Sequence, residues 1–183
     1  MFYAYDAYTQ ISAGVDDPNQ PYLDGSTLGH CLDIMIRNSD NPCAEAMLGE
    51  TAREARVGEL VRNFGLSHTR SDGLSTSAHD VSLLLQRYWT HSGWSNASWA
   101  KFLDSARNQP AQMRRGLPSG FYNAVVYNKT GFGPNSNGYT YNDAAIVEFA
   151  GGRHYIIAAM TNGASQASLA NLGMMIERAV VYE

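Results

Sequence analysis

In the stretch Cys31-Leu-Asp-Ile-Met-Ile-Arg-Asn-Ser-Asp-Asn-Pro-Cys43, a short polar turn joins two helical patterns. Apolar side chains recur with helical spacing over residues 27–37, and the pattern stops at the turn. The next helix is expected to begin with Asn41 as its N-cap and Pro42 at its first helical position. Ser39-Asp40-Asn41 is therefore predicted to lie in a tight turn between two helices.

The two cysteines of the chain, Cys31 and Cys43, lie on either side of this turn. They could form a disulfide across the corner between the helices, which would imply an oxidising compartment. They could equally be two buried thiols that behave as small apolar side chains. A disulfide needs Cα atoms within about 7 Å of each other, so sequence spacing alone leaves both alternatives open.

Outward from this stretch, the first two thirds of the chain have helical periodicity and the last third does not. The opening helix has no Ser, Thr, Asp or Asn before it as a cap, whereas Ser77 is placed to cap a later helix. Further helices are expected at about 2–11, 53–64, 78–90 and 97–108.

From Phe121 onward the pattern becomes that of strands, expected at 124–129, 143–149 and 154–161. The stretch 131–139, rich in Gly and Asn, and Gly151-Gly152 separate them, so an antiparallel meander is predicted. A final helix over 165–181 should cover the sheet with Leu169, Leu172, Ile176 and Ala179. The chain is thus predicted to be an α+β protein, one structural domain with an all-α lobe at 1–120 and a second lobe at 121–183.

Composition narrows the classes of function. The 183 residues are 44% hydrophobic and carry a formal net charge of −4 without runs of Lys or Arg, which argues against a nucleic-acid or anionic-membrane partner. No apolar stretch reaches the roughly 18 residues of a membrane span, and the N-terminus lacks the features of a signal peptide. The histidines have no metal-binding spacing, so neither a metal nor another cofactor is expected.

Lys129-Thr130-Gly131 closes the first predicted strand, and together with Ser39 it supplies much of what acyl transfer at a serine requires. Such a reaction needs a nucleophile with a base, a proton relay, an anchor for a substrate carboxylate and N–H groups aimed at the oxyanion. Lys129 offers a positive charge, Gly131 allows close approach of a ligand amide, and Ser39 can relay a proton. Each tripeptide alone is more typical of a cap or a turn, but their order and context favour a functional pair.

The chain resembles the class A β-lactamase and penicillin-binding-protein group of serine hydrolases over nearly its whole length. The resemblance implies a β-lactamase-like fold, with an antiparallel sheet flanked by helices next to an all-α lobe and an acylation site between the two. It also implies an extracytoplasmic protein and favours the disulfide. The matching residues are the stretch 31–43, Arg115-Gly-Leu-Pro118 with Lys129-Thr130-Gly131, and Tyr155-Ile-Ile-Ala-Ala-Met-Thr-Asn-Gly163 followed by residues 165–183.

Roles follow from the resemblance for both tripeptides. In the turn, it implies that Ser39 shuttles a proton, that Asn41 binds the substrate amide, and that Asp40 is a buried carboxylate holding the turn. In the strand, it implies that Lys129 pairs with the substrate carboxylate. The neighbouring residues would complete the substrate site: Thr130 through a hydrogen bond, Gly131 through the space it leaves, and Phe132 through its backbone N–H in the oxyanion hole.

Two departures from the family stand out. The family places a Ser-x-x-Lys nucleophile motif upstream of the Ser-Asp-Asn turn, and by that comparison it would lie before Met1, together with a helix, two edge strands and an export signal. The Ser-x-x-Lys at Ser98-Trp-Ala-Lys101 lies between the other motifs, and both of its ends are expected to face solvent. The loop at 66–74 has no deacylating Glu, and Asp72, its one carboxylate, is expected to form a turn.

The sequence therefore predicts a β-lactamase-like serine hydrolase that acylates β-lactams or cell-wall peptides, with this chain alone inactive because the nucleophile is absent. The alternative is a non-catalytic module that binds peptidoglycan-like carboxylates reversibly. With fewer strands, the one at 154–161 would be an exposed apolar sheet edge, which predicts an oligomer or strand exchange.

Overall fold

The computed structural model describes residues 1–70, 75–135 and 138–181. This part of the chain forms α-helices, two short 3-10 helices and one three-stranded antiparallel sheet, which confirms the α+β class. By its contacts the chain divides into two compact units, Met1–Ser105 and Ala106–Glu183. None of the described helices is both long enough and apolar enough to cross a membrane.

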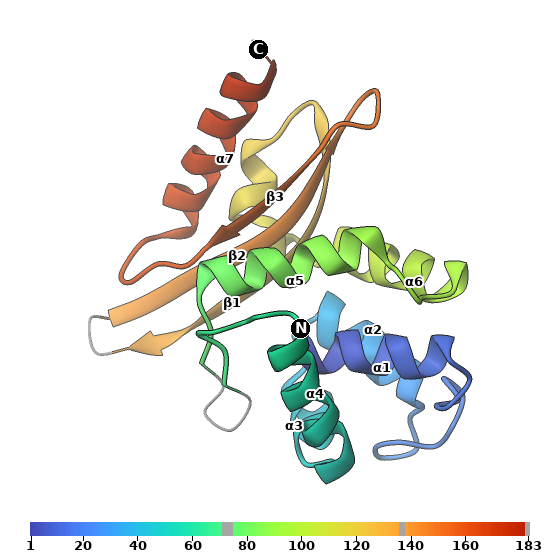
Figure 1. Ribbon diagram of the computed structural model, residues 1–183. Coiled ribbons are helices and arrows are strands. Elements are labelled where there is room, and N and C mark those ends of the chain that lie inside the picture. Colours follow the sequence, from blue (N-terminus) through green and yellow to red (C-terminus); the bar gives the residue numbers. More distant parts are fainter. Residues whose placement is uncertain (71–74, 136–137, 182–183) are drawn as a thin grey trace. The chain divides into compact units, whose positions relative to one another are not determined.

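The first unit is helical, and its helices begin and end close to the predicted residues. The Thr27 side chain caps the second helix by accepting the N–H of His30, and Ser77 caps the fifth by accepting the N–H of Asp80. No side chain caps the first helix, as expected. The helices, labelled in Figure 1, are α1 (Phe2–Ser12), α2 (Leu28–Arg37), α3 (Asn41–Leu48), α4 (Thr51–Asn63), α5 (Ala78–Thr90) and α6 (Asn96–Arg107).

A cluster of aromatic rings forms the core of the first unit. Tyr88 of α5 lies 4.3 Å from Phe102 of α6 and 5.2 Å from Tyr5 of α1, measured between ring centroids. Trp94 joins the cluster 5.0 Å from Tyr8. Such rings contribute large buried areas and edge-to-face contacts, so this cluster ties α1, α5 and α6 together.

A buried arginine provides the polar connection of the same unit. Arg53 of α4 is 1% exposed, and its guanidinium contacts Asp6 of α1 at 2.9 Å, Asp16 at 3.0 Å and Glu50 at 3.1 Å. Arg56 adds a second contact to Asp6, at 2.9 Å. One cation thus joins α1, the loop after it and the start of α4.

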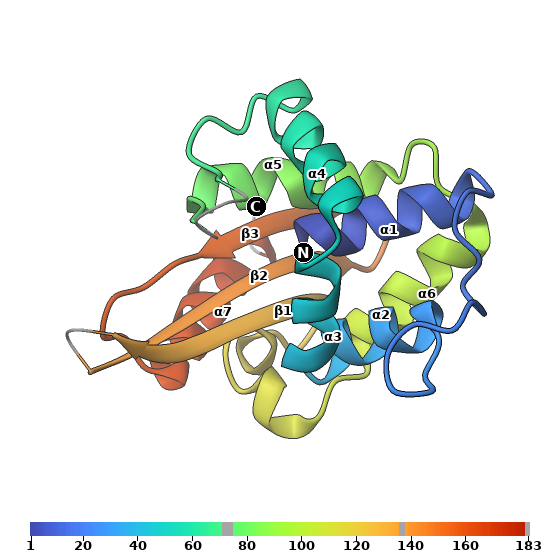
Figure 2. The ribbon, with the colours of Figure 1, turned by 90° about the horizontal axis from the view of Figure 1, so that it is seen from below.

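The second unit places a helix on a sheet. The strands lie in the order β1-β2-β3, with Val126 opposite Val147 and Ala145 opposite Ile157 in the register. Figures 1 and 2 show α7 along one face of this meander. The elements are η1 (Ala111–Arg114), η2 (Leu117–Gly120), β1 (Ala124–Asn135), β2 (Gly138–Phe149), β3 (His154–Ala159) and α7 (Gln166–Val181). The core between sheet and helix consists of Leu117, Phe121, Val126, Ala145, Val147, Phe149 and Val180.

Two expectations for this unit are wrong. Much of the stretch 131–139 does not separate strands, because β1 continues to Asn135 and β2 begins at Gly138 as the two arms of a long hairpin. In α7, Leu172 and Ala179 are exposed, whereas Gly173 and Glu177 are buried. The helix turns this face inward because η2 packs closely against Gly173.

Glu177 is buried because its carboxylate accepts hydrogen bonds from the backbone. Its Oε1 accepts the backbone N–H groups of Tyr122 and Asn123, at 2.8 and 2.7 Å. These bonds hold the chain entering β1 against α7. A charged side chain on a buried helix face is therefore satisfied by backbone donors that are distant in sequence.

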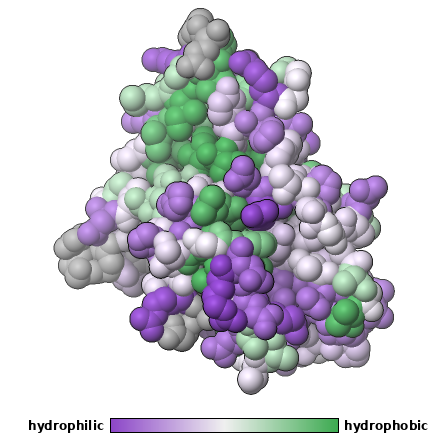
Figure 3. All heavy atoms as spheres, viewed as in Figure 1, coloured by the Kyte–Doolittle hydropathy of each residue, from purple (hydrophilic) through white to green (hydrophobic). Residues whose placement is uncertain are grey.

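Apolar side chains remain exposed on the second unit, among them Met160 after β3 and Leu172, Met175 and Val181 of α7. Figure 3 shows apolar residues gathered below the C-terminus, over this part of the chain. β3 is an edge strand of the described sheet. Its pairing with another chain stays a prediction.

Candidate functional site

The Ser39 turn belongs to the first unit and has an unusual backbone. Ser39 has φ 59°, in the left-handed region that side-chain-bearing residues rarely occupy. The turn closes because the N–H groups of Asn38 and Asp40 both point to the carbonyl of Ile34, at 2.8 and 3.3 Å. A non-glycine residue held in this conformation costs about 1 kcal/mol or more, and such residues cluster at functional sites.

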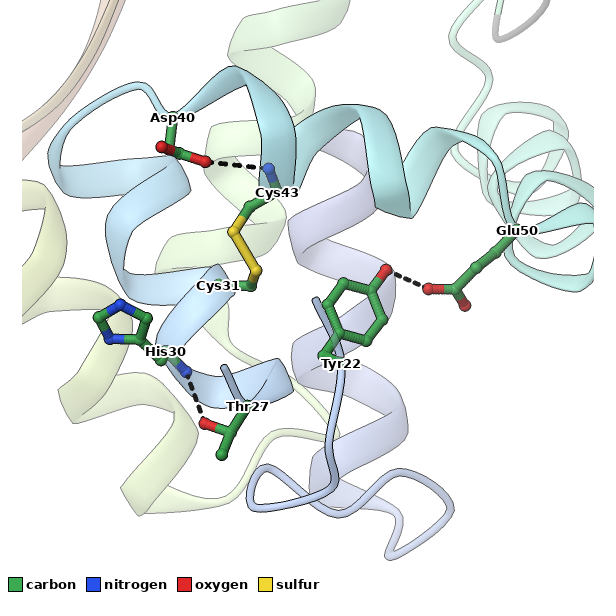
Figure 4. The surroundings of a disulfide bond; sticks show 7 residues. All are labelled: Tyr22, Thr27, His30, Cys31, Asp40, Cys43 and Glu50. Atoms are coloured by element: carbon green, nitrogen blue, oxygen red, sulfur yellow. Dashed lines mark hydrogen bonds between the residues drawn. A yellow bond between two sulfur atoms is a disulfide. The ribbon is translucent and has the colours of Figure 1, made fainter. Parts of the chain in front are cut away.

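Asp40 caps the helix that follows the turn. Its Oδ1 accepts the backbone N–H of Cys43 at 2.9 Å, as Figure 4 shows. The expectation that Asn41 is the N-cap is therefore wrong: Asn41 is the first helical residue, its side chain is exposed, and Pro42 follows it. Asp40 holds the turn as expected, but it is only partly buried, because a cap at a helix end faces solvent on one side.

A disulfide joins Cys31 of α2 to Cys43 of α3, with Cα atoms 5.3 Å apart. Figure 4 shows it beneath the turn, on the same side as the Asp40 cap. Both cysteines are almost fully buried. The covalent link ties the first turn of α2 to the first turn of α3, so the two helices that flank the Ser39 turn are joined to each other.

Lys129 lies inside β1 of the second unit, not at the end of a strand as predicted. The strand continues for six residues beyond it, to Asn135, because β2 pairs with this whole length. The Lys129 Nζ donates to the carbonyl oxygen of Thr130. Burial lowers the pKa of Lys129 to about 8, and the charge of Asp143 acts in the opposite direction.

Asp143, opposite Thr130 in the sheet register, was not singled out by the sequence. It is 2% exposed, and its carboxylate accepts the Nδ2 of Asn128 at 2.9 Å and the backbone N–H of Leu117 at 3.0 Å. Burial raises its pKa to about 6, although these donors and Lys129 counteract the rise. The available signal was one carboxylate at the head of the apolar run Asp143-Ala-Ala-Ile-Val147.

We expect the stability of the second unit to fall as pH rises through the range in which Asp143 ionises. Its folded pKa is about 6, and an unfolded Asp has a pKa of about 3.9. The folded protein therefore binds this proton more tightly, and the resulting stabilisation of about 2–3 kcal/mol is complete below pH 4 and lost by pH 6 to 7.

Chemical unfolding followed by far-UV circular dichroism between pH 4 and 7 measures this dependence. Asp143→Asn should remove the corresponding slope, whereas Asp24→Asn, at an exposed loop position, should retain it. An Asp143→Asn protein with the wild-type slope would show that another group causes the pH dependence.

The three residues after Lys129 differ in how open they are. Thr130 is 5% exposed and its hydroxyl donates to the carbonyl of Asn142 at 3.2 Å. At Gly131 a Cβ would meet no heavy atom within 4 Å, so the backbone there is open. Phe132 is exposed and stacks on Tyr139, with 6.4 Å between ring centroids. Of the three, Gly131 is the most accessible to a ligand backbone.

The Ser-x-x-Lys at residues 98–101 is not arranged as predicted. Lys101 is exposed as expected, but Ser98 is only 4% exposed. Its hydroxyl accepts hydrogen bonds from Ser12 at 2.9 Å and Ser95 at 3.1 Å. Ser98 lies one helical turn before the buried Phe102, which explains why it faces inward. Asp72, expected to form a turn, lies outside the described residues.

The residues predicted to form the site are divided between the two units. The first unit brings together Ser39, Asp40, Asn41 and the disulfide, and the second holds Lys129 to Phe132 on one strand. Within the described residues, no three His, Cys, Asp or Glu side chains gather closely enough to hold a metal ion. The predicted site residues can therefore bind a ligand through hydrogen bonds and through the positive charge of Lys129.

Comparisons with known proteins agree with this architecture. A mutant of the class A β-lactamase of the last common ancestor of Gram-negative bacteria has a TM-score of 0.83 and 18% identity, covering 100% of this chain and 82% of that one. A PBP-A mutant in an acyl-enzyme complex with penicillin G has a TM-score of 0.80 and 18% identity, covering 100% and 79%. A β-lactamase from Burkholderia vietnamiensis has a TM-score of 0.83 and 16% identity, covering 98% and 80%.

These likenesses show a shared fold, and a search of curated proteins finds no match to the sequence. The family itself is shown by sequence. The family model Beta-lactamase2, the beta-lactamase enzyme family, matches residues 9–179. Because that match spans nearly all of the chain, the protein belongs to the beta-lactamase enzyme family.

Proposed function

We propose that this chain carries the substrate-binding residues of a β-lactamase-like serine hydrolase that acts on β-lactams or cell-wall peptides. In this proposal Lys129 binds the substrate carboxylate and the open backbone at Gly131 and Phe132 receives the substrate amide. Ser39 relays a proton and Asn41 binds the substrate amide. The Cys31–Cys43 disulfide supports an extracytoplasmic location.

The observation that carries the proposal is the combination of a partly buried cation and an open strand edge. β1 is one of the two outer strands of the described sheet, so every second residue of it directs its backbone groups away from β2. Lys129 lies on this strand, and Gly131, two residues later, has open space where a side chain would be. An extended ligand can therefore pair with the strand edge while its carboxylate meets the ammonium group.

The lowered pKa of Lys129 suits this role. Burial holds it at about 8, so the amine is mainly protonated at neutral pH but is poorly solvated. A ligand carboxylate would add a charge-assisted contact to an ammonium group that burial has partly removed from water. Binding should weaken as pH rises above 8, because the deprotonated amine no longer attracts an anion.

Acylation needs a nucleophilic serine in addition to these substrate-binding residues. A serine Oγ must form a bond to the substrate carbonyl carbon while the amide C–N bond breaks, and the proton must pass to the leaving nitrogen. The Ser-x-x-Lys within these 183 residues does not offer such an oxygen, because Ser98 is enclosed and both of its acceptor positions are taken by Ser12 and Ser95. We therefore propose that the 183-residue chain binds substrate without forming an acyl-enzyme.

Incubation with a fluorescent penicillin and intact-mass analysis should show no covalent adduct on the 183-residue chain. Benzylpenicillin should still bind reversibly, detected as saturable shifts of the Gly131 and Phe132 amides in two-dimensional NMR spectra. Lys129→Met keeps the apolar stem and removes the charge, and it should weaken this binding about tenfold or more, as expected for a buried charge-assisted contact. Arg62→Met, at an exposed position of the first unit, is the matched control.

A covalent adduct would contradict the absence of acylation, and an adduct at Ser98 would also contradict the enclosure of that residue. Binding of benzylpenicillin that is unaffected by Lys129→Met would overturn the assigned carboxylate site. The alternative function, a non-catalytic module for peptidoglycan-like carboxylates, would be favoured if a cell-wall peptide bound at the same amides and a longer chain carrying an upstream Ser-x-x-Lys also formed no adduct.

A further inference from the structure

We propose that a pocket inside the first unit binds a small carboxylate with an apolar body. The pocket is a cavity of about 490 Å³, within the usual range of small-molecule sites, about 300–1,000 Å³. It lies where α6 begins, and residues of α1 and α2 complete its wall. Neither Lys129 nor the Ser39 turn lines it, so the proposal does not depend on the substrate site.

Ser98 supplies a hydrogen-bond donor that is unused within the described protein. The hydroxyls of Ser12 and Ser95 both donate to its Oγ, at 2.9 and 3.1 Å, and the Ser98 N–H donates to the Ser95 hydroxyl at 3.1 Å. A serine hydroxyl has two acceptor positions and one proton, so Ser98 has only its proton left to offer. No described residue accepts that proton, although the side chain is 4% exposed and lines the cavity.

A buried donor without an acceptor is costly, and a ligand that supplies an oxygen would remove the cost. The serine cluster is also rigid, because the Ser95 N–H donates to the Ser12 hydroxyl at 2.9 Å and joins α6 to the end of α1. Ser98 can therefore hold a defined direction toward the cavity. The ligand atom that meets it must be an acceptor.

The charges around Ser98 select an anionic acceptor. Lys101, three residues further along α6, lines the same cavity and is exposed. The cavity also lies at the N-terminal end of α6, a 12-residue helix whose dipole favours negative charge there. A carboxylate fits both features better than a neutral hydroxyl group.

Asp33 also lines the cavity, but its negative charge is already compensated. Arg37 contacts its carboxylate at 2.9 Å, and the Ser105 hydroxyl donates to it at 2.6 Å. These partners hold the pKa of Asp33 below its ordinary value, despite its partial burial. Lys101 also lowers the pKa of Asp33 through its charge, but no ion-pair contact joins the two among the described residues, so its ammonium group can still contact a ligand anion.

The rest of the wall is apolar or weakly polar. Tyr8, Ile11, Pro18 and Leu32 also line the cavity. Thr27 and His30 line it as well, and Figure 4 shows them at the first turn of α2, with the Thr27 hydroxyl accepting the His30 N–H. An alkyl or aryl chain of about six carbons suits such a wall, since each buried CH₂ contributes about 0.8 kcal/mol.

The test uses the 183-residue protein labelled with 15N and titrated with hexanoate or 1-hexanol at constant salt. We expect saturable shifts of the Ala97 and Ser98 amides with hexanoate, and affinity for 1-hexanol about fivefold weaker, the effect of one charge at a partly exposed helix terminus. Lys101→Met should weaken hexanoate binding about fivefold for the same reason. Arg62→Met and Lys129→Met should leave hexanoate binding unchanged.

Ser98→Ala tests the donor directly and should weaken hexanoate binding further than it weakens 1-hexanol binding. If this variant is unfolded, the comparison of Lys101→Met with Arg62→Met decides the question alone. Equal affinity for hexanoate and 1-hexanol, or shifts that Lys101→Met leaves unchanged, would overturn the proposal. Hexanoate binding abolished by Lys129→Met would place the anion at the substrate site and would also overturn it.

Discussion

Replacing Arg53 by methionine is expected to lower the unfolding free energy of the first unit by about 3–5 kcal/mol, the usual effect of removing one partner of a buried ion pair. Arg53 is 1% exposed and contacts Asp6, Asp16 and Glu50 at 2.9 to 3.1 Å. Methionine fills part of the same volume but leaves Asp6 with Arg56 as its cation and Asp16 without the guanidinium. The stability falls mainly because buried carboxylates lose their cation, and less because packing is lost.

The three tryptophans of the chain, Trp89, Trp94 and Trp99, all belong to the first unit, so their fluorescence during chemical unfolding measures this unit alone. Arg62→Met, on the same helix but at an exposed position, should change the stability by less than about 0.5 kcal/mol. Arg53→Lys keeps the positive charge but loses the planar guanidinium, which can bond several carboxylates at once. Its loss of stability should therefore lie between those of Arg62→Met and Arg53→Met. A loss below about 1 kcal/mol for Arg53→Met would mean that the carboxylates find other partners or water.

Replacing Gly120 by alanine is expected to destabilise the second unit by about 3 kcal/mol, near the upper end for an overpacked site. A Cβ at Gly120 would overlap the carbonyl oxygen of Ala170 and lie 2.7 Å from the backbone nitrogen of Met174. These are backbone atoms of α7, which cannot rotate away as a side chain could. The helix would have to move off η2, which opens the core between α7 and the sheet.

Gly133→Ala is the matched control in the same unit, because a Cβ there meets no heavy atom within 4 Å. Hydrogen exchange of the amides of β1, β2 and β3 measures the effect, since the second unit has no tryptophan. Gly120→Ala should raise the exchange rates of these amides while the tryptophan fluorescence transition stays in place. Unchanged exchange in Gly120→Ala would show that α7 and η2 can separate at little cost.

The two proposed anion sites differ in the surroundings of the lysine that each one contains. The chain has two lysines, Lys101 and Lys129, and each lies in one of the proposed anion sites. Lys101 is exposed beside an enclosed hydroxyl, whereas Lys129 is largely buried on a strand and has a pKa near 8. The hexanoate and benzylpenicillin titrations therefore separate the sites, because each lysine variant should affect one ligand.

Local signals in the sequence predicted most of the helices. Ser77 caps α5 as expected, and the helical spacing within 27–37 corresponds to α2. Such signals succeed because a cap or a helical stripe acts over about one turn of the chain. The error at Asn41 has the same short range: Asp40 and Asn41 are both good caps, and Asp40, whose backbone is extended, takes the N-cap position.

Long-range contacts decided what the sequence did not show. The burial of Ser98 depends on Ser12, 86 residues away, and that of Arg53 depends on Asp6, 47 residues away. Likewise Asp143 is buried through a hydrogen bond from Leu117, 26 residues earlier. No periodicity or short motif carries such information, because burial is set by which surfaces meet after folding.

The sequence by itself determined the α+β class, the family and the order of the Ser39 turn and the Lys129 strand, because these depend on short-range pattern and on motif order. Tertiary structure alone decided three further features: the joining of Cys31 to Cys43, the place of Lys129 inside a long hairpin strand, and the enclosure of Ser98. Each of these depends on distances between segments that are remote in the chain. Packing sets those distances, and through them the pKa of Lys129 and the unused proton of Ser98.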